Sequence, residues 1–339
     1  MNSRELFHAT FAGEKNLPVP FWIMRQAGRY LPEYRELKSK YSFVDIVKTP
    51  ELSLEAALQP MRRFDFDCSI LFSDILVVSE ALGLPYGFKD EGGIYLEKRI
   101  ESEKNIEALD AESVVEKLDY VFKSLKMLRK ELPQKAIIGF CASPFTLAAY
   151  MIEGESSKTF PRFSKFMKSE SKLFFALLEK LSRALSLYAK QQLYCGIDAF
   201  QIFDSHGSMS PTEKYGEYSA QWISPIISEL NASARTILFA NNMSERFAEM
   251  APLGADAYAL DDSVKLSEIF TTYQGHYVLQ GNLKNTLLAT ATPQEVAKST
   301  REIIDDMKPY GRHIFNLSHG ITPDAKLENV YALCEEIKK

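Results

Sequence analysis

Short runs of β-branched or aromatic residues recur along this chain, and a longer stretch with apolar residues at helical spacing follows each run. A repeated alternation of strand and helix predicts an α/β protein with a parallel sheet. About eight runs are present, which is enough to close the sheet into a (β/α)8 barrel, although an open doubly wound sheet has the same pattern. The expected strands are residues 21–24, 68–72, 136–140, 199–203, 236–239, 257–260, 277–280 and 313–316.

Several of the intervening helices are expected to begin at a Ser or Thr that is followed by proline. The hydroxyl residue can cap the helix, and proline is favoured at the first helical position because the N–H that it lacks would have no partner there. A Glu three residues after the cap completes a capping box at Ser210 and at Thr292. The pairs are Thr49-Pro50, Ser143-Pro144, Ser210-Pro211, Thr292-Pro293 and Thr322-Pro323.

Three further segments have their own signals. A helix is expected to begin at Pro32, after a loop that contains Gly28. Residues 160–194 carry apolar side chains at helical spacing, which predicts one or two core-facing helices. Residues 86–100, which include Gly87, Gly92 and Gly93, are expected to form a loop or a small excursion.

Unusual polar residues follow the expected strands at the end where a barrel holds its chemistry. In a (β/α)8 barrel, functional residues come directly after the carboxyl ends of the strands, and residues before the strands serve stability. The residues in question are Arg25 and Arg29 after the first strand, Ser73 and Asp74 after the second, Asp204, Ser205 and His206 after the fourth, and Ser318 and His319 after the eighth.

The pair Arg25 and Arg29 predicts an anionic ligand, because a guanidinium is always charged and its planar fork fits carboxylate or phosphate. The alternative is a solvated surface where the arginines pair with acids. The formal net charge of −5 disfavours nucleic acid, since no basic stripe is present. A cluster of Arg25, Arg29 and Arg35 in an acidic protein therefore indicates a local site for an anion.

Other bulk features restrict the class of protein. The 339 residues would allow two domains, but a single barrel reaches this size, so one domain over residues 1–339 is expected. No run approaches the roughly 18 apolar residues of a membrane span, and the N-terminal segment lacks an export signal, so a cytoplasmic protein is expected. The cysteines stand singly, which argues against a disulfide framework or a zinc cage: Cys68, Cys141, Cys195 and Cys334.

Asp74 is a single carboxylate inside the apolar run 70–78. Burying that charge without a partner is costly. Asp74 either caps a helix together with Ser73 or awaits a cation or the N–H groups of a ligand. The residues alone leave both interpretations open.

Two stretches resemble the signatures of the uroporphyrinogen decarboxylase family. One is Met24-Arg25-Gln26-Ala27-Gly28-Arg29 preceded by Pro20-Phe21-Trp22, and the other is GFCASPFTLAAYMIEG at 139–154. The similarity runs through nearly the whole chain. It implies a single TIM barrel that removes the four acetate carboxyls of uroporphyrinogen III to give coproporphyrinogen III in porphyrin and heme biosynthesis. It also implies a homodimer and an enzyme with no cofactor or metal.

The resemblance also implies a role for each site residue. Asp74 is expected to accept hydrogen bonds from pyrrole N–H groups, and Arg25 and Arg29 to bind the acidic side chains. Arg25 is a possible proton donor, and because a guanidinium is a weak acid, donation through water or through His319 is equally open. The expected substrate-binding residues are Arg25, Gln26, Ala27, Gly28, Arg29, Asp74, Tyr150, Phe203, Ser205 and His319.

Some positions depart from the family pattern. The family usually has Gly-x-Asp-Trp where this chain has Ala259-Leu-Asp-Asp262, and often Gly-Asn-Leu-Asp-Pro where this chain has Gly281-Asn-Leu-Lys-Asn285. Ser318 replaces a frequent glycine, and Phe145 a frequent tryptophan. Two other functions remain as alternatives: a catalytically silent tetrapyrrole-binding barrel, and a methyltransferase of the same superfamily. The latter would need a zinc site with His-x-Cys, a spacing that this sequence lacks.

Overall fold

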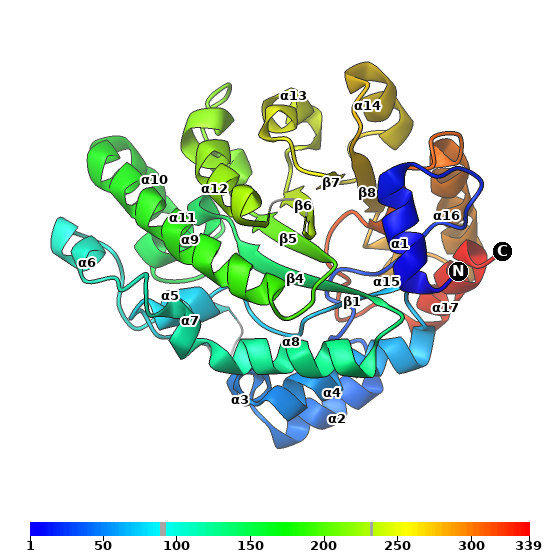
Figure 1. Ribbon diagram of the computed structural model, residues 1–339, viewed down its shortest axis with the longest axis horizontal. Coiled ribbons are helices and arrows are strands. Elements are labelled where there is room, and N and C mark those ends of the chain that lie inside the picture. The colour runs from blue at the N-terminus through cyan, green and yellow to red at the C-terminus, as the bar shows by residue number, and fades with distance from the viewer. Residues whose placement is uncertain (89–92, 231–232) are drawn as a thin grey trace.

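Parallel strands form the centre of the molecule and helices lie outside them (Figure 1). The computed structural model describes residues 1–88, 93–230 and 233–339. The parallel sheet has the order β1-β4-β5-β6-β7-β8-β9, so each strand pairs with the next one along the chain. Its strands are β1 (Cys68–Ile70), β4 (Ala136–Ala142), β5 (Ala199–Asp204), β6 (Arg235–Ala240), β7 (Ala257–Ala259), β8 (Val278–Leu283) and β9 (His313–Leu317).

The segment around Phe21 takes the eighth place in the barrel. Phe21 forms a parallel bridge with Phe315 of β9, and Phe315 N–H donates to Pro20 O at 2.9 Å. On the other side, Asp67 N–H, next to β1, donates to Phe21 O at 3.0 Å. These bonds join the two edges of the sheet, and the predicted (β/α)8 barrel is confirmed.

The strand predicted at residues 21–24 is wrong in its extent, since Phe21 alone makes a β-bridge. The chain turns immediately afterwards, because Gln26 N–H donates to Ile23 O at 2.9 Å. Met24 N–H is then bound by a side chain, Asn316 Oδ1, at 3.0 Å, in place of a neighbouring strand. The other seven predicted strands are present, with ends that differ by a few residues.

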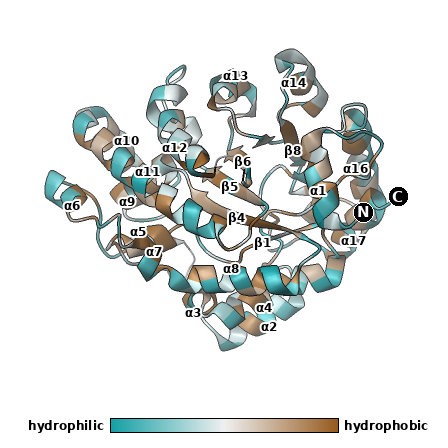
Figure 2. Ribbon diagram, viewed as in Figure 1, coloured by the Kyte–Doolittle hydropathy of each residue, from teal (hydrophilic) through white to brown (hydrophobic). Residues whose placement is uncertain are grey.

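The helices have apolar faces toward the strands and polar faces outside (Figure 2). In the part of the chain that the structure describes, no helix is long and apolar enough to cross a membrane. The helices of four or more residues are α1 (Ser3–Ala12), α2 (Pro32–Lys40), α3 (Phe43–Lys48), α4 (Pro50–Phe64), α5 (Val77–Ala81), α6 (Glu103–Glu107), α7 (Val114–Lys117), α8 (Asp119–Glu131), α9 (Pro144–Glu153), α10 (Pro161–Ser169), α11 (Ser171–Leu193), a π-helical turn (Gly216–Ala220), α12 (Gln221–Leu230), α13 (Phe247–Met250), α14 (Leu266–Tyr273), α15 (Leu287–Thr290), α16 (Pro293–Met307) and α17 (Leu327–Ile337).

Three of the five predicted Ser/Thr-Pro helix starts are confirmed. Thr49, Ser143 and Thr292 are the N-caps of α4, α9 and α16, and Thr292 forms the predicted capping box with Glu295.

The starts predicted at Ser210 and Thr322 are wrong. After Ser210 the chain makes a turn in which Lys214 N–H donates to Pro211 O, and Glu213 has a left-handed φ of 63°, which a helix cannot contain. After Thr322 a turn also forms, and α17 begins only at Leu327.

The predicted excursion at residues 86–100 contains an antiparallel hairpin of β2 (Tyr86–Phe88) and β3 (Ile94–Leu96). Gly92 lies outside the described residues. Leu96 N–H donates to Gly154 O and Ser156 N–H to Ile94 O, both at 2.8 Å, so the hairpin is fixed at the end of α9. The helices expected within residues 160–194 are α10 and α11.

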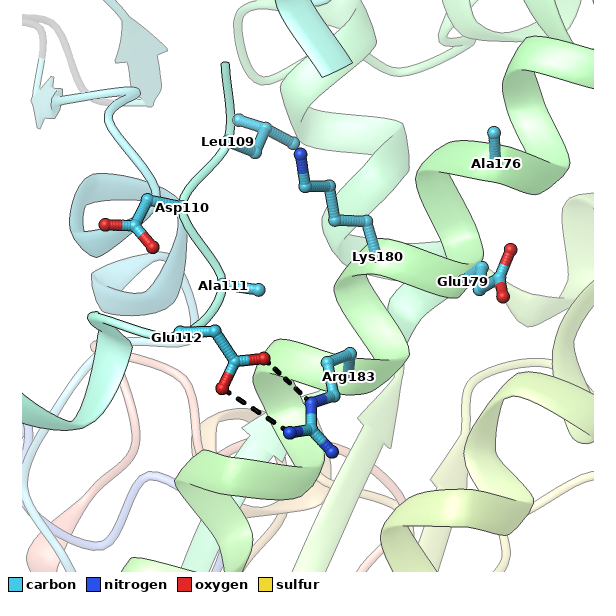
Figure 3. A pocket seen from close by; sticks show the side chains of 8 residues that line it. All are labelled: Leu109, Asp110, Ala111, Glu112, Ala176, Glu179, Lys180 and Arg183. Atoms are coloured by element: carbon cyan, nitrogen blue, oxygen red, sulfur yellow. Dashed lines mark hydrogen bonds and ion pairs between the residues drawn. The ribbon is translucent and has the colours of Figure 1, made fainter. Parts of the chain in front are cut away.

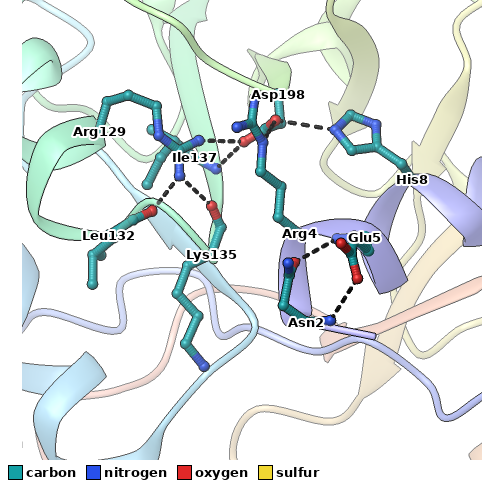
Figure 4. A network of polar contacts seen from close by, with 9 residues as sticks. All are labelled: Asn2, Arg4, Glu5, His8, Arg129, Leu132, Lys135, Ile137 and Asp198. Carbon is teal, nitrogen blue, oxygen red and sulfur yellow. Dashed lines mark hydrogen bonds and ion pairs between the residues drawn. The ribbon is translucent and has the colours of Figure 1, made fainter.

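The N-terminal end of the barrel is closed by ion pairs around Asp198, the residue before β5 (Figure 4). The Asp198 side chain is 1% exposed and accepts from Arg4 Nε at 2.6 Å, His8 Nε2 at 3.0 Å and Arg129 Nη1 at 2.8 Å. Ile137 N–H also donates to it at 2.8 Å. These contacts attach α1 and α8 to the sheet, so this end serves stability, as expected of a barrel.

Candidate active site

The loop after Phe21 has a defined shape that exposes two arginines. Gln26 is buried, and its Oε1 accepts from Ile23 N–H at 3.3 Å while its Nε2 donates to Cys68 O at 3.3 Å. Tyr30 Oη donates to Gln26 O at 2.8 Å. Anchored in this way, the loop holds Arg25 in the left-handed region at φ 63°, a conformation that costs of order 1–3 kcal/mol in a non-glycine residue.

Arg25 and Arg29 are both exposed. Among the described residues, no carboxylate lies within 4.0 Å of either guanidinium. The surface ion pairs of the alternative interpretation are therefore not seen in this part of the chain. Arg35 does not join the pair, since its Nη1 donates to Arg29 O at 2.8 Å and to Tyr30 O at 3.1 Å and so supports the loop.

Asp74 follows β1 and is partly buried. Its Oδ1 accepts from Leu76 N–H at 2.8 Å, and nothing in the described residues donates to Oδ2. Burial raises the pKa of Asp74 to about 6, although the Leu76 N–H and the charge of Arg25 both lower it. Asp74 thus makes the helix-capping type of contact with one oxygen and keeps the other available.

The charge of Arg25 acts on three of the other expected residues. Arg25 lowers the pKa of Asp74, of Tyr150 and of His319, and Asp74 raises the pKa of Tyr150. In each case burial is the largest cause of the shift. The structure therefore brings Arg25, Asp74, Tyr150 and His319 together, from four separate parts of the chain.

His319 follows β9 and packs against Arg25 and Phe239. Its ring lies 5.7 Å from that of Phe239. The neighbouring Gly320 lies beneath Arg25, because a Cβ there would be 2.5 Å from Arg25 Cδ. Burial lowers the pKa of His319, and Arg25 lowers it further, so its imidazole is neutral at pH 7.

Tyr150 and Phe203 each belong to a cluster of contacting aromatic rings. The Tyr150 ring lies 5.6 Å from Phe160 and 5.1 Å from His206, and His206 lies 4.4 Å from Phe160. Phe203 contacts Phe140 at 5.6 Å and Phe239 at 5.7 Å. Phe203 and Phe239 thus connect His319 to the strands β5 and β6, whereas Tyr150 contacts the rings of Phe160 and His206.

His206 was seen in the sequence but was not among the expected site residues. Its Nε2 is buried with no partner in the described residues, and burial lowers the pKa of the ring. The position directly after Ser205 was the signal that could have identified it. Ser205 itself is partly buried beside it.

The fully buried Asp204 connects the end of β5 to the start of α9. It accepts from Ser143 Oγ at 2.5 Å, Thr146 Oγ1 at 3.1 Å and Ser219 Oγ at 2.8 Å. Thr146 Oγ1 also accepts from His206 N–H at 3.1 Å. This network sets the position of Tyr150, one turn along α9, relative to Ser205 and His206.

The remaining expected residues are less directly placed. Gln26 points into the core, whereas Ala27 and Gly28 lie partly exposed between the arginines. Arg29 shares the loop of Arg25, and its charge acts on the pKa of Tyr34. The structure does not connect Arg29 with Asp74.

A surface hollow lies elsewhere, between α11 and residues 109–112 (Figure 3). Arg183 pairs there with Glu112 at 3.0 Å, and Lys180 Nζ donates to Ile106 O at 2.7 Å. None of the expected site residues lines it. The hollow is the surface groove where α11 packs against residues 109–112.

A family model described as uroporphyrinogen decarboxylase (URO-D) matches residues 2–339. The chain belongs to the uroporphyrinogen decarboxylase family. A relative of that name from Legionella pneumophila (strain Paris) is 38% identical over 327 residues, 94% of this chain and 92% of the relative. Another, from Dichelobacter nodosus, is 38% identical over 335 residues, 98% of this chain and 96% of its own length. The resemblance of the two signatures is thus confirmed.

The fold of this family member is shared with more distant proteins. A methyltransferase from Methanosarcina mazei superposes with a TM-score of 0.82 at 18% identity, over 100% of this chain and 98% of the methyltransferase. A B12-independent methionine synthase from Shewanella has a TM-score of 0.57 at 14% identity, over 96% of each chain. At such identities the likeness concerns the fold alone.

Proposed function

We propose that this family member decarboxylates the four acetate side chains of uroporphyrinogen III and so produces coproporphyrinogen III for porphyrin and heme biosynthesis. The observation that carries the proposal is the pairing of two kinds of group at one end of the barrel. Arg25 and Arg29 have no carboxylate partner among the described residues, and Asp74 keeps one oxygen without a donor there. A ligand with both carboxylates and N–H groups satisfies all of them.

Decarboxylation of an acetate side chain requires an electron sink. An acetate on a pyrrole loses carbon dioxide only if the electron pair of the breaking C–C bond can enter the ring. Protonation of the adjacent ring carbon first makes the ring cationic and provides that sink. Loss of carbon dioxide leaves an exocyclic methylene, which gains a proton to become a methyl group while the ring carbon loses one. The net change per acetate is one proton consumed and one carbon dioxide released.

In this proposal Asp74 stabilises the cationic ring. A carboxylate already in place near the pyrrole nitrogens lowers the energy of the charge as it develops. At pH 7 the carboxyl is mainly ionised, because its raised pKa of about 6 is still lower than the pH. The substrate serves as its own electron sink, so the proposed route uses no cofactor.

The other residues bind and orient the substrate in this proposal. Arg25 and Arg29 hold acidic side chains, with Gln26, Ala27 and Gly28 shaping the loop between them. Tyr150, Ser205 and His319 offer hydrogen-bonding groups, and Phe203 offers an apolar surface for the macrocycle. Three groups are candidates for the proton donor in this proposal: Arg25, a water molecule and His319.

We further propose that residues 1–339 form one domain, and that the protein acts as a cytoplasmic homodimer without a nucleic-acid partner. The single domain is supported by one contiguous cluster of buried apolar side chains that includes residues from every strand of the parallel sheet. Analytical ultracentrifugation tests the dimer.

The test of function is anaerobic incubation of the purified protein with uroporphyrinogen III. We expect products with seven, six, five and finally four carboxyl groups, with one carbon dioxide released per step. Asp74→Asn, which keeps the size of the side chain, is the paired variant and should lose far more turnover than binding. Bound porphyrinogen without carbon dioxide release from the native protein would favour a silent tetrapyrrole-binding barrel instead. Methyl transfer with bound zinc would favour the methyltransferase.

A further inference from the structure

The loops after β8 and β9 are joined by hydrogen bonds from a residue outside the expected site. Asn285 N–H donates to Ser318 Oγ at 3.3 Å, and Asn285 Nδ2 donates to Gly320 O at 2.9 Å. Ser318 N–H donates to Leu283 O at 2.7 Å. Together these bonds hold residues 318–320 against the end of β8, and we call Asn285 and Ser318 the clasp.

The segment that the clasp holds carries one residue of the proposed site and contacts another. His319 lies between the two attachment points, Ser318 and Gly320. Gly320 lies beneath Arg25, where a Cβ would be 2.5 Å from Arg25 Cδ and 3.0 Å from Nε. A shift of this segment would therefore move the His319 ring and change the surface on which the Arg25 side chain rests.

The next residue fixes the other side of the segment. Ile321 N–H donates to Met24 O at 2.9 Å, directly before Arg25. The segment is thus bound to the arginine loop on one side and to the clasp on the other. Without the hydrogen bonds that Asn285 donates, the backbone bonds of Ser318 N–H to Leu283 O and of Ile321 N–H to Met24 O would remain, and the Gly320 carbonyl between them would lose its donor.

Both members of the clasp depart from the family pattern, and they depart together. A proline at position 285 would have no N–H to donate, and a glycine at 318 would have no hydroxyl to accept it. Two other departures also face each other, since Lys284 Nζ lies 3.7 Å from Asp262 Oδ2. The unusual residues of this region are partners of one another, which explains how the chain tolerates them.

The residues of the clasp are shielded from water, so loss of their hydrogen bonds should displace residues 318–320. Ser318 is 3% exposed and Asn285 is partly buried, so water does not readily replace their bonds. A buried carbonyl that loses its donor is destabilised, so the segment gains by moving to a new partner. A displacement of about 1 Å at a reacting group can cost about a hundredfold in rate.

We propose that Asn285 is a positioning residue that acts through Ser318 and Gly320 to hold His319 and Arg25 in place for the reaction. This inference rests on the proposed decarboxylation for its kinetic consequence. Its structural part, the position of His319, can be tested in the ligand-free protein. A failure of the structural part can therefore be distinguished from a failure of the proposed function.

The experiment compares Asn285→Ala and Ser318→Ala with the matched control Lys284→Ala, which changes the adjacent, exposed member of the loop. For the clasp variants we expect kcat with uroporphyrinogen III to fall about tenfold, with KM changed less than about twofold. In the ligand-free proteins, the imidazole NMR signals of His319 should shift in both clasp variants and stay unchanged in Lys284→Ala.

Unchanged His319 signals in soluble, folded Asn285→Ala and Ser318→Ala would overturn the proposal. So would a lower unfolding midpoint with unaltered kcat, since that result would mean that the clasp serves stability alone. If the native protein releases no carbon dioxide, the proposed function fails, and the His319 signals still decide whether the clasp positions the ring.

Discussion

The surroundings of Asp74 act on its pKa in opposite directions. Its surroundings raise its pKa to about 6 chiefly through burial, whereas Arg25 and the Leu76 N–H favour the charged form. A group whose pKa is raised on folding binds protons more tightly in the folded state, so its ionised form costs stability at pH 7. The carboxylate is retained at that cost, which is typical of a functional residue.

This balance predicts the pH dependence of turnover. If ionised Asp74 is required, kcat/KM should fall about tenfold per pH unit below pH 6, because kcat/KM reports the pKa values of the free enzyme. Asp74→Asn should lose this acid limb and about 10²–10³ in kcat, the usual loss for a preorganised electrostatic group. Steady-state kinetics over a range of about pH 5 to 8 measures both changes.

Asp74→Asn should also change the stability of the protein. Asp74→Asn removes a charge that is unfavourable at pH 7, so it should unfold at a higher urea concentration than the native protein. Equal losses in product binding and in turnover would contradict the electrostatic role of Asp74, and so would reduced stability at pH 7.

Arg29 is expected to act in binding. It is exposed and has no carboxylate partner in the described residues, so Arg29→Ala removes no internal ion pair there. A hydrogen bond to a charged group contributes about 1.5–3 kcal/mol, so coproporphyrinogen should bind about ten- to a hundredfold more weakly. Fluorescence titration under anaerobic conditions measures this, with Arg183→Ala on the outside of α11 as the control arginine. A loss of kcat that exceeds the loss of affinity would argue against this role.

Among the elements, the junction of β5 and α9 has the densest buried hydrogen bonding of the site. Thr146 Oγ1 donates to Asp204 and accepts from His206 N–H, so one hydroxyl connects the helix that carries Tyr150 to the loop that carries His206. The helix start itself was predictable from Ser143-Pro144. Its attachment to Asp204 depends on the neighbouring strand.

Thr146→Val keeps the shape of the side chain and removes this hydroxyl. The free energy of unfolding should fall by about 1–3 kcal/mol, because a buried N–H and a buried carboxylate each lose a partner. Thr146→Ser, which keeps the hydroxyl, should lose less than half as much. Urea denaturation measures the difference, and the amide signal of His206 should move in the valine variant alone. Equal destabilisation in both variants would mean that the lost methyl contact, and not the hydroxyl, matters.

The two ends of the whole barrel have separate tasks. At the carboxyl end of the strands lie two arginines without a carboxylate partner in the described residues, a carboxyl with a raised pKa and a buried histidine nitrogen. At the other end, Asp198 is fully paired and attaches α1 and α8 to the sheet (Figure 4). Burial alone would raise the pKa of Asp198, but hydrogen bonds from His8, Ile137 and Arg4 lower it overall.

Asp198 should therefore contribute stability that depends on pH. Its lowered pKa means that the contribution is complete above the unfolded value of about 3.9 and is lost as the pH falls through the lower folded value. Asp198→Asn should cost about 3–5 kcal/mol at pH 7, since it leaves buried donors and Arg129 unpaired. Below about pH 4 its stability should fall less steeply than that of the native protein. Arg4→Gln, which changes a partner that is 42% exposed, should cost less than about 1 kcal/mol.

Much of this architecture was predictable because it depends on local chemistry. Strand and helix periods indicated the barrel, and the carboxyl ends of the strands indicated Arg25, Asp74 and His319, whereas only the family resemblance indicated Tyr150. The two signatures indicated the family. The capping box at Thr292 was predictable because both of its bonds lie within four residues.

Other features depend on contacts between distant parts of the chain, which no local pattern encodes. Phe21 joins the sheet edges by a single bridge because Met24 is bound by Asn316, 292 residues away. Gln26 faces the core because Cys68 O accepts from it, and Ser210 and Thr322 fail as helix starts because turns form after them. Asn285 meets Ser318 only once β8 and β9 pair. Sequence periodicity indicates which elements form, whereas closure of the barrel decides which of their ends come into contact.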